Sequence, residues 1–535
     1  MAAMVLVAMV VVTVIVAAMV VLGRRMVMFG RVVLVCGVVV FEGHAAIVGS
    51  PHVLRGNGID RPDALTGSPN GDNAGMPIPT RAQLDEFRRS FSGDILEPQS
   101  PGYDDARRVW NAMFDRRPAV VARPTGIADV QAAVRFGRER DLEIAVRGGG
   151  HSAVGHSTTD GGLVIDLARM NEVSVDPTRG LARTGGGALL GHLDLAAQEH
   201  GLVCPVGVVG HTGVAGLTLG GGVGRLQRRF GLTIDHLRAV ELVAADGRLV
   251  RATADEEPEL FWGLRGAGAN FGVATSLELE LEPFSGTLHR GVHIHPASDV
   301  HELWAIFREF SRSAPDTISM IFTVAVTSSA EDYPGAVVGA PIVVISYNHS
   351  GAGADVQRDI APLLAGPKAL SATATSEPYV KVQGSSDLTL AWGSRTFILG
   401  GYVEDCSPSV LDGFVGHVEE VPGDSSISVT ALGGAIGRVA EGAMAFCGRD
   451  VPFDVSPDTS WTDPALDDAN ADWIRGAMAI VEPDLLPGRY INELSEAGPE
   501  VTRASYGEAK LERLRALKRT WDPTNLFRLN HNIAP

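Results

Sequence analysis

Short apolar runs alternate with amphipathic stretches from residue 119 onwards. Residues 119–122 and 143–146 are apolar runs that predict buried strands. The segment between them, 127–138, places its apolar side chains on one face, which is typical of an amphipathic helix. Residues 163–167 form a further apolar run. This part of the chain therefore predicts a β-α-β unit followed by another strand.

Two later segments have the pattern of β-hairpins. Residues 171–183 turn at Asp176-Pro177-Thr178-Arg179-Gly180, and residues 241–253 turn at Ala245-Asp246-Gly247-Arg248. Residues 188–199 between them predict a helix. Hairpins make antiparallel pairs and β-α-β units make parallel ones, so we expect mixed sheets.

The pattern changes after Pro283, where glycine becomes rarer and longer strands alternate with helices. The chain predicts strands at 292–295, 318–326 and 338–347, and helices at 300–311, 355–364 and 408–418. Ahead of the first strand, residues 81–91 and 103–114 predict two short helices. The fold class expected is α+β, in which a large antiparallel sheet backed by helices follows a part built on mixed sheets.

The amino terminus is strongly apolar. Residues 1–22 contain one polar residue, Thr13, and no charge, followed by Arg24-Arg25 and a shorter apolar run at 32–41. Three interpretations of residues 1–46 fit this pattern: a membrane anchor, a twin-arginine export signal, or a misassigned start of the reading frame. The protein is membrane-anchored or exported if residues 1–46 are genuine and cytoplasmic otherwise, with membrane contact only through residues 1–22. Residues 47–75 have no periodicity and predict a disordered connector.

Composition and charge narrow the class of partner. The 535 residues include 63 acidic and 45 basic ones, which gives a formal charge of −18. The chain therefore lacks the excess of basic charge that is typical of nucleic-acid-binding proteins. The four cysteines, at positions 36, 204, 406 and 447, form no Cys-x-x-Cys pair, so we expect neither a metal site nor a disulfide framework. The 63 glycines exceed the usual share of about 7% and cluster in a few loops.

Two of these glycine-rich loops are candidates for binding a large ligand. The first, Arg147-Gly148-Gly149-Gly150-His151-Ser152, follows a predicted strand, and three glycines in a row let a ligand approach the backbone closely. The second, residues 204–224, contains no Asp, Glu, Lys or Arg and is too rich in glycine for a helix or a central strand. A Rossmann fold needs the spacing Gly-x-Gly-x-x-Gly, but Gly222-Val223-Gly224 is followed by Gln227 and Gly266-Ala267-Gly268 by Phe271, which argues against NAD.

These loops belong to a set of four ordered motifs. The other two are Leu264-Arg265-Gly266-Ala267-Gly268-Ala269-Asn270-Phe271-Gly272-Val273 and the carboxy-terminal segment 522–533. Over residues 119–535 the chain resembles the oxygen-dependent FAD-linked oxidases of the berberine-bridge-enzyme type, with the FAD-binding fold of the vanillyl-alcohol-oxidase (PCMH) group. The resemblance implies an FAD-binding domain at 76–288, a substrate domain at 289–480 and a return to the FAD-binding domain at 481–535.

The resemblance also implies how FAD is held. His151 matches the histidine that bonds covalently to the flavin 8α-methyl carbon, and such a bond makes the flavin a stronger oxidant. Many relatives add a cysteinyl bond near the position of Val209, whereas Cys204 lies five residues earlier, so a second bond is not expected. The cofactor-binding residues implied are Arg147, Gly148, Gly149, Gly150, His151, Ser152, Val209, Gly210, His211, Thr212, Gly213, Gly216, Thr218, Gly220, Gly222, Val273, Asn530 and Asn532.

The catalytic and substrate residues come from the later part of the chain. Tyr490 and Asn492 resemble the family's Tyr-x-Asn strand near the flavin, where alternation would point both side chains the same way and a tyrosine can act as general base. Tyr379 and Gln383 match the family's substrate-side loop. The alternative for each of these four residues is that its side chain only packs within the fold.

The activity implied is that of an oxidase. A small-molecule substrate, namely a carbohydrate, an alcohol or a natural-product scaffold of secondary metabolism, gives a hydride to flavin N5, and dioxygen reoxidises the flavin to yield hydrogen peroxide. Two alternatives remain open at this point. One is a flavin dehydrogenase that uses another electron acceptor, and the other is a flavin-binding homologue without turnover.

Overall fold

The computed structural model describes residues 79–284, 286–326, 338–420 and 424–535, together with the two short antiparallel strands β1 (Val33–Val35) and β2 (Val38–Val40). Apart from these strands, the predicted anchor or export segment and the connector up to residue 75 lie outside the described residues. Asp72–Pro535 forms one compact unit, separate from Met1–Gly71. No helix within the described ranges has the length and apolar character needed to cross a membrane.

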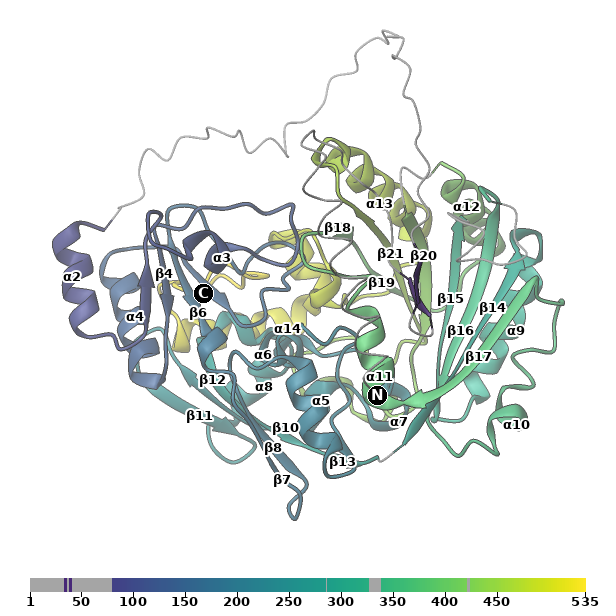
Figure 1. Ribbon diagram of the computed structural model, residues 1–535, viewed down its shortest axis with the longest axis horizontal. Coiled ribbons are helices and arrows are strands. Elements are labelled where there is room, and N and C mark those ends of the chain that lie inside the picture. Colours follow the sequence, from purple (N-terminus) through teal and green to yellow (C-terminus); the bar gives the residue numbers. More distant parts are fainter. Residues whose placement is uncertain (1–32, 36–37, 41–78, 285, 327–337, 421–423) are drawn as a thin grey trace, which may run out of the picture. The chain divides into compact units, whose positions relative to one another are not determined.

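The first sheet of the compact unit is mixed, as predicted. Its order is β3–β4–β6–β5 (Asp94–Leu96, Val120–Arg123, Leu163–Asp166 and Ile144–Arg147). The pairs β4–β6 and β5–β6 are parallel, and the helix α4 (Ile127–Glu139) crosses over from β4 to β5. The strand β3 pairs with β4 in the antiparallel direction. Phe136 of α4 stacks on Phe87 of α2 (Arg81–Arg89) with ring centroids 4.3 Å apart. The apolar faces of two amphipathic helices thus pack in the core of this sheet (Figure 1).

The second sheet is antiparallel and contains both predicted hairpins. Its order is β11–β10–β12–β8–β7 (Leu249–Thr253, Leu237–Val243, Val273–Glu280, Leu181–Gly185 and Val173–Asp176). Its apolar face packs against α5 (Leu190–Gln198), α6 (Val214–Gly220) and α8 (Pro258–Ala267) in one hydrophobic core. The expected helix at 103–114 is wrong in length: α3 ends at Arg107, and the buried Asn111 side chain binds the carbonyls of Ala153 and Thr396 instead of continuing the helix.

The third sheet has eight strands and is antiparallel, which confirms the large antiparallel sheet of the α+β prediction. The order is β17–β14–β16–β15–β20–β21–β18, and β19 also pairs with β21 (Ser371–Pro378, Thr287–Pro296, Pro341–His349, Ile318–Val326, Asp424–Ala431, Phe453–Trp461, Arg395–Ile398 and Gly401–Val403). The boundary expected at residue 288 falls inside β14 and stays a prediction.

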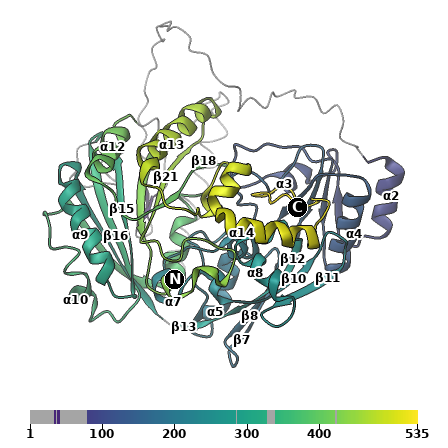
Figure 2. The ribbon, with the colours of Figure 1, turned by 180° about the vertical axis from the view of Figure 1, so that it is seen from behind.

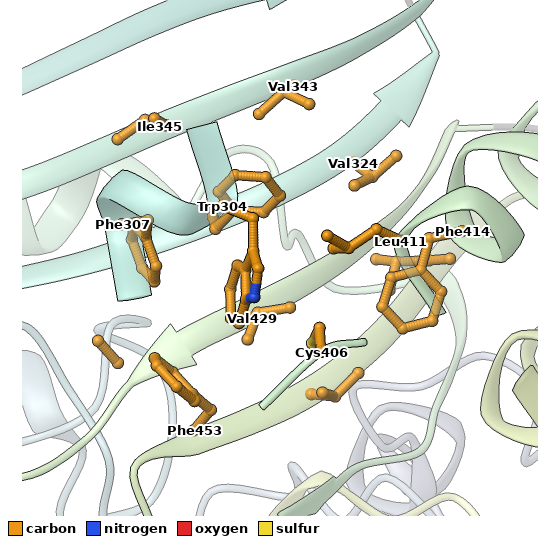
Figure 3. Close-up of a cluster of buried hydrophobic side chains, with 14 of the residues drawn as sticks. Trp304, Phe307, Val324, Val343, Ile345, Cys406, Leu411, Phe414, Val429 and Phe453 are labelled. Atoms are coloured by element: carbon orange, nitrogen blue, oxygen red, sulfur yellow. The ribbon is translucent and has the colours of Figure 1, made fainter. Parts of the chain in front are cut away.

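One face of the eight-stranded sheet is apolar and carries the helices. Val324 and Val429 lie on the same side of the sheet as Trp304 and Phe307 of α9 (Val300–Ser313), as Figure 3 shows. The Phe322 ring contacts Trp304 with centroids 5.3 Å apart. The helices α12 (Pro408–Val418) and α13 (Asp467–Val481) complete the same core, and Figure 1 places them with α9 on one side of the sheet.

The opposite face of this sheet is polar near β20 and β21. There Ser426 donates to Asp458 at 3.0 Å, and the hydroxyls of Thr323 and Ser428 lie 3.0 Å apart. Because side chains alternate along a strand, Asp454, Ser456 and Asp458 of β21 share this face. The polar side chains on this face are suitable partners for a polar ligand.

The chain ends by returning to the first half of the compact unit. The long helix α14 (Pro499–Trp521) lies beside α8 (Figure 2), and the segment after it reaches Asn270, whose side-chain oxygen accepts the Ile533 N–H at 3.0 Å. Lys518 anchors this return from a fully buried position. Its ammonium lies 2.8 Å from the equally buried Asp522 and donates to the Asn270 and Phe527 carbonyls at 2.8 and 2.9 Å.

We expect Lys518→Met to lower the midpoint of chemical denaturation strongly. The substitution leaves the Asp522 carboxylate buried without its cation, and breaking one side of a buried pair costs about 3–5 kcal/mol. The control is Lys381→Met, which removes an exposed ion pair with Glu377 that is worth about 0–1 kcal/mol. Equal denaturation midpoints for the two variants would show that the buried pair does not anchor the carboxy terminus.

Candidate functional site

The two glycine-rich loops, which lie about 60 residues apart in the chain, are in direct contact. A Cβ atom placed on Gly149 would lie 2.2 Å from the Gly213 nitrogen, and one on Gly213 would lie 2.4 Å from the Gly149 nitrogen. Gly150 has φ = +73°, a conformation that glycine adopts without strain. Only residues without a side chain allow this approach of the two backbones.

The second loop differs from the prediction in one respect, because residues Val214–Gly220 form the helix α6. Glycine content argued against a helix, but Val214, Leu219 and the buried Ala215 give this turn of chain an apolar face in the core. The loop before α6 is fixed by backbone bonds around Gly213: the Leu190 N–H donates to the Thr212 carbonyl at 2.9 Å, and the Val214 N–H donates to the Ala188 carbonyl at 2.8 Å. Tertiary packing overrode the low intrinsic propensity.

His151 and His211 meet where the loops touch. Their Nε2 and Nδ1 atoms lie 2.6 Å apart, and the His151 ring stacks on Trp110 with centroids 4.7 Å apart and planes 14° from parallel. Burial, and then the proximity of His211, lowers the pKa of His151 to about 3. His151 is therefore neutral at physiological pH, which is the form in which imidazole is nucleophilic.

A third segment, residues 384–394, lies against both histidines. The Gly210 N–H donates to Asp387 at 2.6 Å, the Trp110 indole donates to the Leu390 carbonyl at 2.8 Å, and Trp392 makes an edge contact with His151 at 6.1 Å. The sequence motifs did not indicate Trp110, Asp387 or Trp392. The only signal in the sequence is weak: Trp110 and Trp392 are two of the seven tryptophans of the chain.

The first loop is held by Arg147 and Ser152. Arg147 donates to the Ala106 carbonyl, lies 3.9 Å from Asp166, and places its guanidinium over the Trp392 ring at 5.7 Å. The Ser152 hydroxyl accepts the His156 N–H at 3.0 Å. These bonds fix the turn that presents His151.

Tyr490 and Asn492 lie together, although not on a strand as predicted. Tyr490 precedes a single-turn 3-10 helix, Ile491–Glu493, and in this turn the Asn492 amide still reaches the Tyr490 hydroxyl at 3.1 Å. The same hydroxyl accepts the N–H groups of Gly222 and Val223 at 3.1 and 3.2 Å. The predicted strand at Tyr490 and Asn492 is wrong, because these contacts with the residues that follow α6 hold the chain in a turn.

Close approach of other side chains explains two of the predicted glycines. A Cβ atom on Gly220 would lie 2.1 Å from the Asn492 side-chain oxygen. One on Gly222, which has φ = +90°, would lie 2.2 Å from the Thr233 hydroxyl. The end of the second loop is thus shaped to receive the Tyr490 turn.

The carboxy-terminal residues reach the same region. Asn530 donates to the Ala269 and Phe527 carbonyls at 2.9 Å each, and the His531 ring bonds the Ile491 carbonyl at 3.0 Å. Val273 begins β12 with its side chain in the core around α4, so only its backbone is placed to face a ligand.

Tyr379 and Gln383 lie on the helix α11 (Tyr379–Gln383) and are buried against α5. Both bind Asp194, at 3.1 and 3.3 Å, and Gln383 also donates to the Gly207 carbonyl at 2.9 Å. Burial raises the pKa of Asp194 to about 7. The structure gives both side chains partners within the protein, and their role toward substrate stays a prediction.

Cys204 is buried in the core of the second sheet. Burial raises the pKa of its thiol, which disfavours the thiolate that would be needed for a bond to flavin. Within the described residues, no group of His, Cys, Asp and Glu side chains could hold a metal ion.

The residues of the site fit the FAD that the resemblance implies. Several buried polar atoms in it have no hydrogen-bond partner in the protein and are therefore available to a ligand: His211 Nε2, Thr218 Oγ1, Asn530 Oδ1, His531 Nδ1 and Asn532 Oδ1. They come from the second loop and the carboxy-terminal segment, the same segments that the four motifs predict to contact the cofactor. Buried polar groups of this kind cost free energy unless they are paired.

Gly149→Ala should abolish FAD binding, because the new methyl group would overlap the Gly213 backbone and push the two loops apart. The measurement is flavin absorbance per polypeptide after purification. Gly416→Ala, at a position of α12 with no atom within 4 Å of the new Cβ, is the control and should keep its flavin. Full flavin content in Gly149→Ala would contradict the inferred contact of the loops.

Comparison with known proteins agrees with this geometry. Residues 118–253 match the FAD binding domain family, and residues 489–534 match the family described as berberine and berberine like. The chain is 31% identical to (R)-6-hydroxynicotine oxidase of Paenarthrobacter nicotinovorans over 474 residues, 83% of this chain and 97% of that protein. An FAD-linked oxidoreductase of Dictyostelium discoideum is 29% identical, with 84% and 97% covered.

Solved structures show the same fold. The crystal structure of 6-hydroxy-D-nicotine oxidase from Arthrobacter nicotinovorans aligns with a TM-score of 0.74 at 28% identity, covering 83% of this chain and 98% of that one. A chitooligosaccharide oxidase aligns with a TM-score of 0.75 at 23% identity, which shows the fold alone, with 85% and 99% covered. The chain belongs to the berberine-bridge-enzyme-like FAD-linked oxidoreductases, and it is an FAD-dependent enzyme of the PCMH-type fold.

Proposed function

We propose that the protein is an oxygen-dependent oxidase that holds FAD through a single covalent bond to His151. The observation that carries the proposal is the position of His151, a neutral imidazole presented by the first loop where it touches the second. The buried thiol of Cys204 supports a single bond. When bound, FAD supplies the hydride acceptor and passes the electrons to dioxygen, which gives hydrogen peroxide.

We propose that Tyr490 is the residue through which the protein itself takes part in turnover. Three N–H donors converge on its hydroxyl oxygen, from Gly222, Val223 and Asn492, while no acceptor for its proton lies within the described part of the chain. Burial raises the pKa of Tyr490, and these donors oppose that effect by stabilising the phenolate. Tyr490 is therefore placed to exchange a proton with a bound substrate, and Asn492 holds its hydroxyl in position.

The polar face of the eight-stranded sheet supports a polar substrate. The relatives include enzymes named for 6-hydroxynicotine and for chitooligosaccharides, so the family accepts both amine-bearing natural products and carbohydrates. For this chain we propose a small molecule with an oxidisable C–O or C–N bond, bound against the Asp454, Ser456 and Asp458 face of β21 and next to Tyr490. Tyr379 and Gln383 support such a site from α11 through their bonds to Asp194.

The wild-type protein should keep its yellow flavin in the pellet after acid precipitation, and its mass should exceed that of the polypeptide by one FAD. His151→Ala should release all its flavin to the supernatant, because the proposed single bond is lost and the Cys204 thiol is buried in the core of the second sheet. His200→Ala, an exposed histidine in the turn after α5, is the control. Release of all flavin by the wild type would overturn the tether, and a second flavin bond in the mass of tryptic peptides would overturn single attachment.

Turnover tests the oxidase assignment. With carbohydrates, alcohols and amines as substrates, we expect one hydrogen peroxide per substrate oxidised in air. Turnover with artificial electron acceptors but not with dioxygen would instead identify a dehydrogenase.

We expect Asn492→Ala to shift the ascending limb of the kcat/KM profile to higher pH by about 1–2 units, since a hydrogen bond to a charged group is worth about 1.5–3 kcal/mol. The sign follows because the base works deprotonated, so losing a donor to the phenolate raises the pKa of Tyr490 and moves the limb upward. Asn171→Ala on the surface is the control and should leave the profile in place. An unmoved limb in Asn492→Ala would remove Tyr490 as the base.

A further inference from the structure

Two arginines, Arg225 and Arg290, have no carboxylate partner among the described residues. Arg225 follows the second glycine-rich loop and donates to the Ser386 hydroxyl at 2.8 Å and to the Val382 carbonyl at 3.4 Å. Arg290 of β14 donates to the Ser385 hydroxyl at 3.4 Å. The two guanidiniums therefore approach the same short segment, where both of their positive charges remain to be balanced.

The positive charge of Arg225 is poorly compensated within the protein. Burial, and then the proximity of Arg290, lowers the pKa of Arg225 to about 10. The carboxylate that opposes this effect belongs to Asp194. Its oxygens already accept bonds from Tyr379 and Gln383, and burial raises its pKa to about 7. The Arg225 Nε atom is buried without a hydrogen-bond partner in the protein, and such a donor costs free energy until an acceptor reaches it.

Arg290 belongs to the polar face of the eight-stranded sheet. It is in register with Asn348 of β16, which is in register with Ser319 of β15, and side chains directly across neighbouring strands point to the same side. Ser319 and Thr323 are four residues apart on β15, so alternation places them on one face. Because the Thr323 hydroxyl meets that of Ser428 on the polar face, Arg290 lies at the β14 end of the same face.

Arg225 lies close to the proposed base. The N–H groups of Gly222 and Val223 donate to the Tyr490 hydroxyl, and Arg225 follows Val223 by two residues. Two residues of fully extended chain span at most about 7 Å. The backbone that carries Arg225 is therefore within the length of a small molecule of the Tyr490 hydroxyl.

The other end of the polar face is acidic. Asp454 and Asp458 share this face of β21, and Glu493 lies near enough to Asp458 for the two charges to interact. Burial raises the pKa of all three carboxyl groups, that of Asp458 to about 6, so Asp458 is largely ionised at neutral pH. Three strands separate β14 from β21, which places their backbones roughly 19 Å apart along the sheet. An anion is repelled from the β21 end and attracted to the arginines.

We propose that Arg225 and Arg290 bind a carboxylate of the substrate and thereby determine its specificity and orientation. Given the proposed oxidase function, on which this assignment rests, the substrate is a carboxylic acid whose oxidisable C–O or C–N bond lies next to Tyr490. A planar guanidinium matches a carboxylate with two parallel N–H···O bonds. The formal charge of −18 disfavours a polyanionic substrate, so a single carboxylate fits the pair of arginines best.

Binding of matched acids and amides tests the proposal without turnover. The probes are benzoate, phenylacetate and para-hydroxymethylbenzoate, each compared with its uncharged primary amide. Their binding to the flavin-loaded full-length protein is measured at neutral pH by calorimetry and by the change in flavin absorbance. We expect at least one acid to bind about tenfold to hundredfold more tightly than its amide, the usual size of a hydrogen bond to a charged group.

Two variants locate the charge that carries this preference. Arg225→Gln and Arg290→Gln should each weaken binding of the preferred acid about tenfold or more and leave binding of its amide unchanged. Arg179→Gln, which removes an exposed charge from the turn between β7 and β8, is the control and should keep the wild-type preference. If Arg225→Gln loses amide binding as well, because its bonds to residues 382 and 386 are lost, Arg290→Gln alone makes the comparison.

The outcomes separate this assignment from the oxidase function. Equal affinity of the wild type for acids and amides, or no binding of any acid, would overturn the carboxylate site and leave the oxidase function standing. An acid preference that survives in Arg290→Gln would also overturn the site. Acid binding that depends on the arginines, without hydrogen peroxide release in air from any oxidisable acid, would instead support the site and overturn the oxidase function.

Discussion

The contact between the Gly149 and Gly213 backbones is the constraint on which the rest of the site depends. At this point the two backbone segments approach so closely that neither residue could carry a side chain, since a Cβ on either residue would lie 2.2–2.4 Å from the other backbone. The contact brings together the loop after β5 and the loop before α6. It also sets His151 beside His211, so that the placement of the reactive imidazole follows from backbone packing.

The histidines work in surroundings with little charge. The second loop contains no ionisable side chain other than His211 between Cys204 and Gly224, and Trp110 and Trp392 supply the nearest aromatic contacts. Burial, and then the proximity of His211, disfavours an imidazolium and holds the pKa of His151 far below its usual value. The same lack of charge makes each unpartnered polar atom of the site a strong attachment point for a cofactor.

The carboxy terminus completes the site from the other side. The buried ion pair of Lys518 and Asp522 fixes the end of α14, and the segment beyond it reaches the turn that carries Tyr490 through the bond between His531 and the Ile491 carbonyl. Tyr490 in turn binds backbone N–H groups at the end of the second loop. Three segments distant in sequence are thus linked by hydrogen bonds around one site.

The sequence by itself determined the elements with regular periodicity and the four ordered motifs. It predicted the helix at 127–138, both hairpins, the antiparallel sheet with its helices, and the FAD-linked family. It did not show that residues 214–220 form a helix, that Tyr490 lies in a turn, or that Trp110, Asp387 and Trp392 surround His151. Those features depend on contacts between residues up to some 280 positions apart, such as Trp110 with Leu390. Local propensity has no information about such contacts, so only the tertiary structure could decide them.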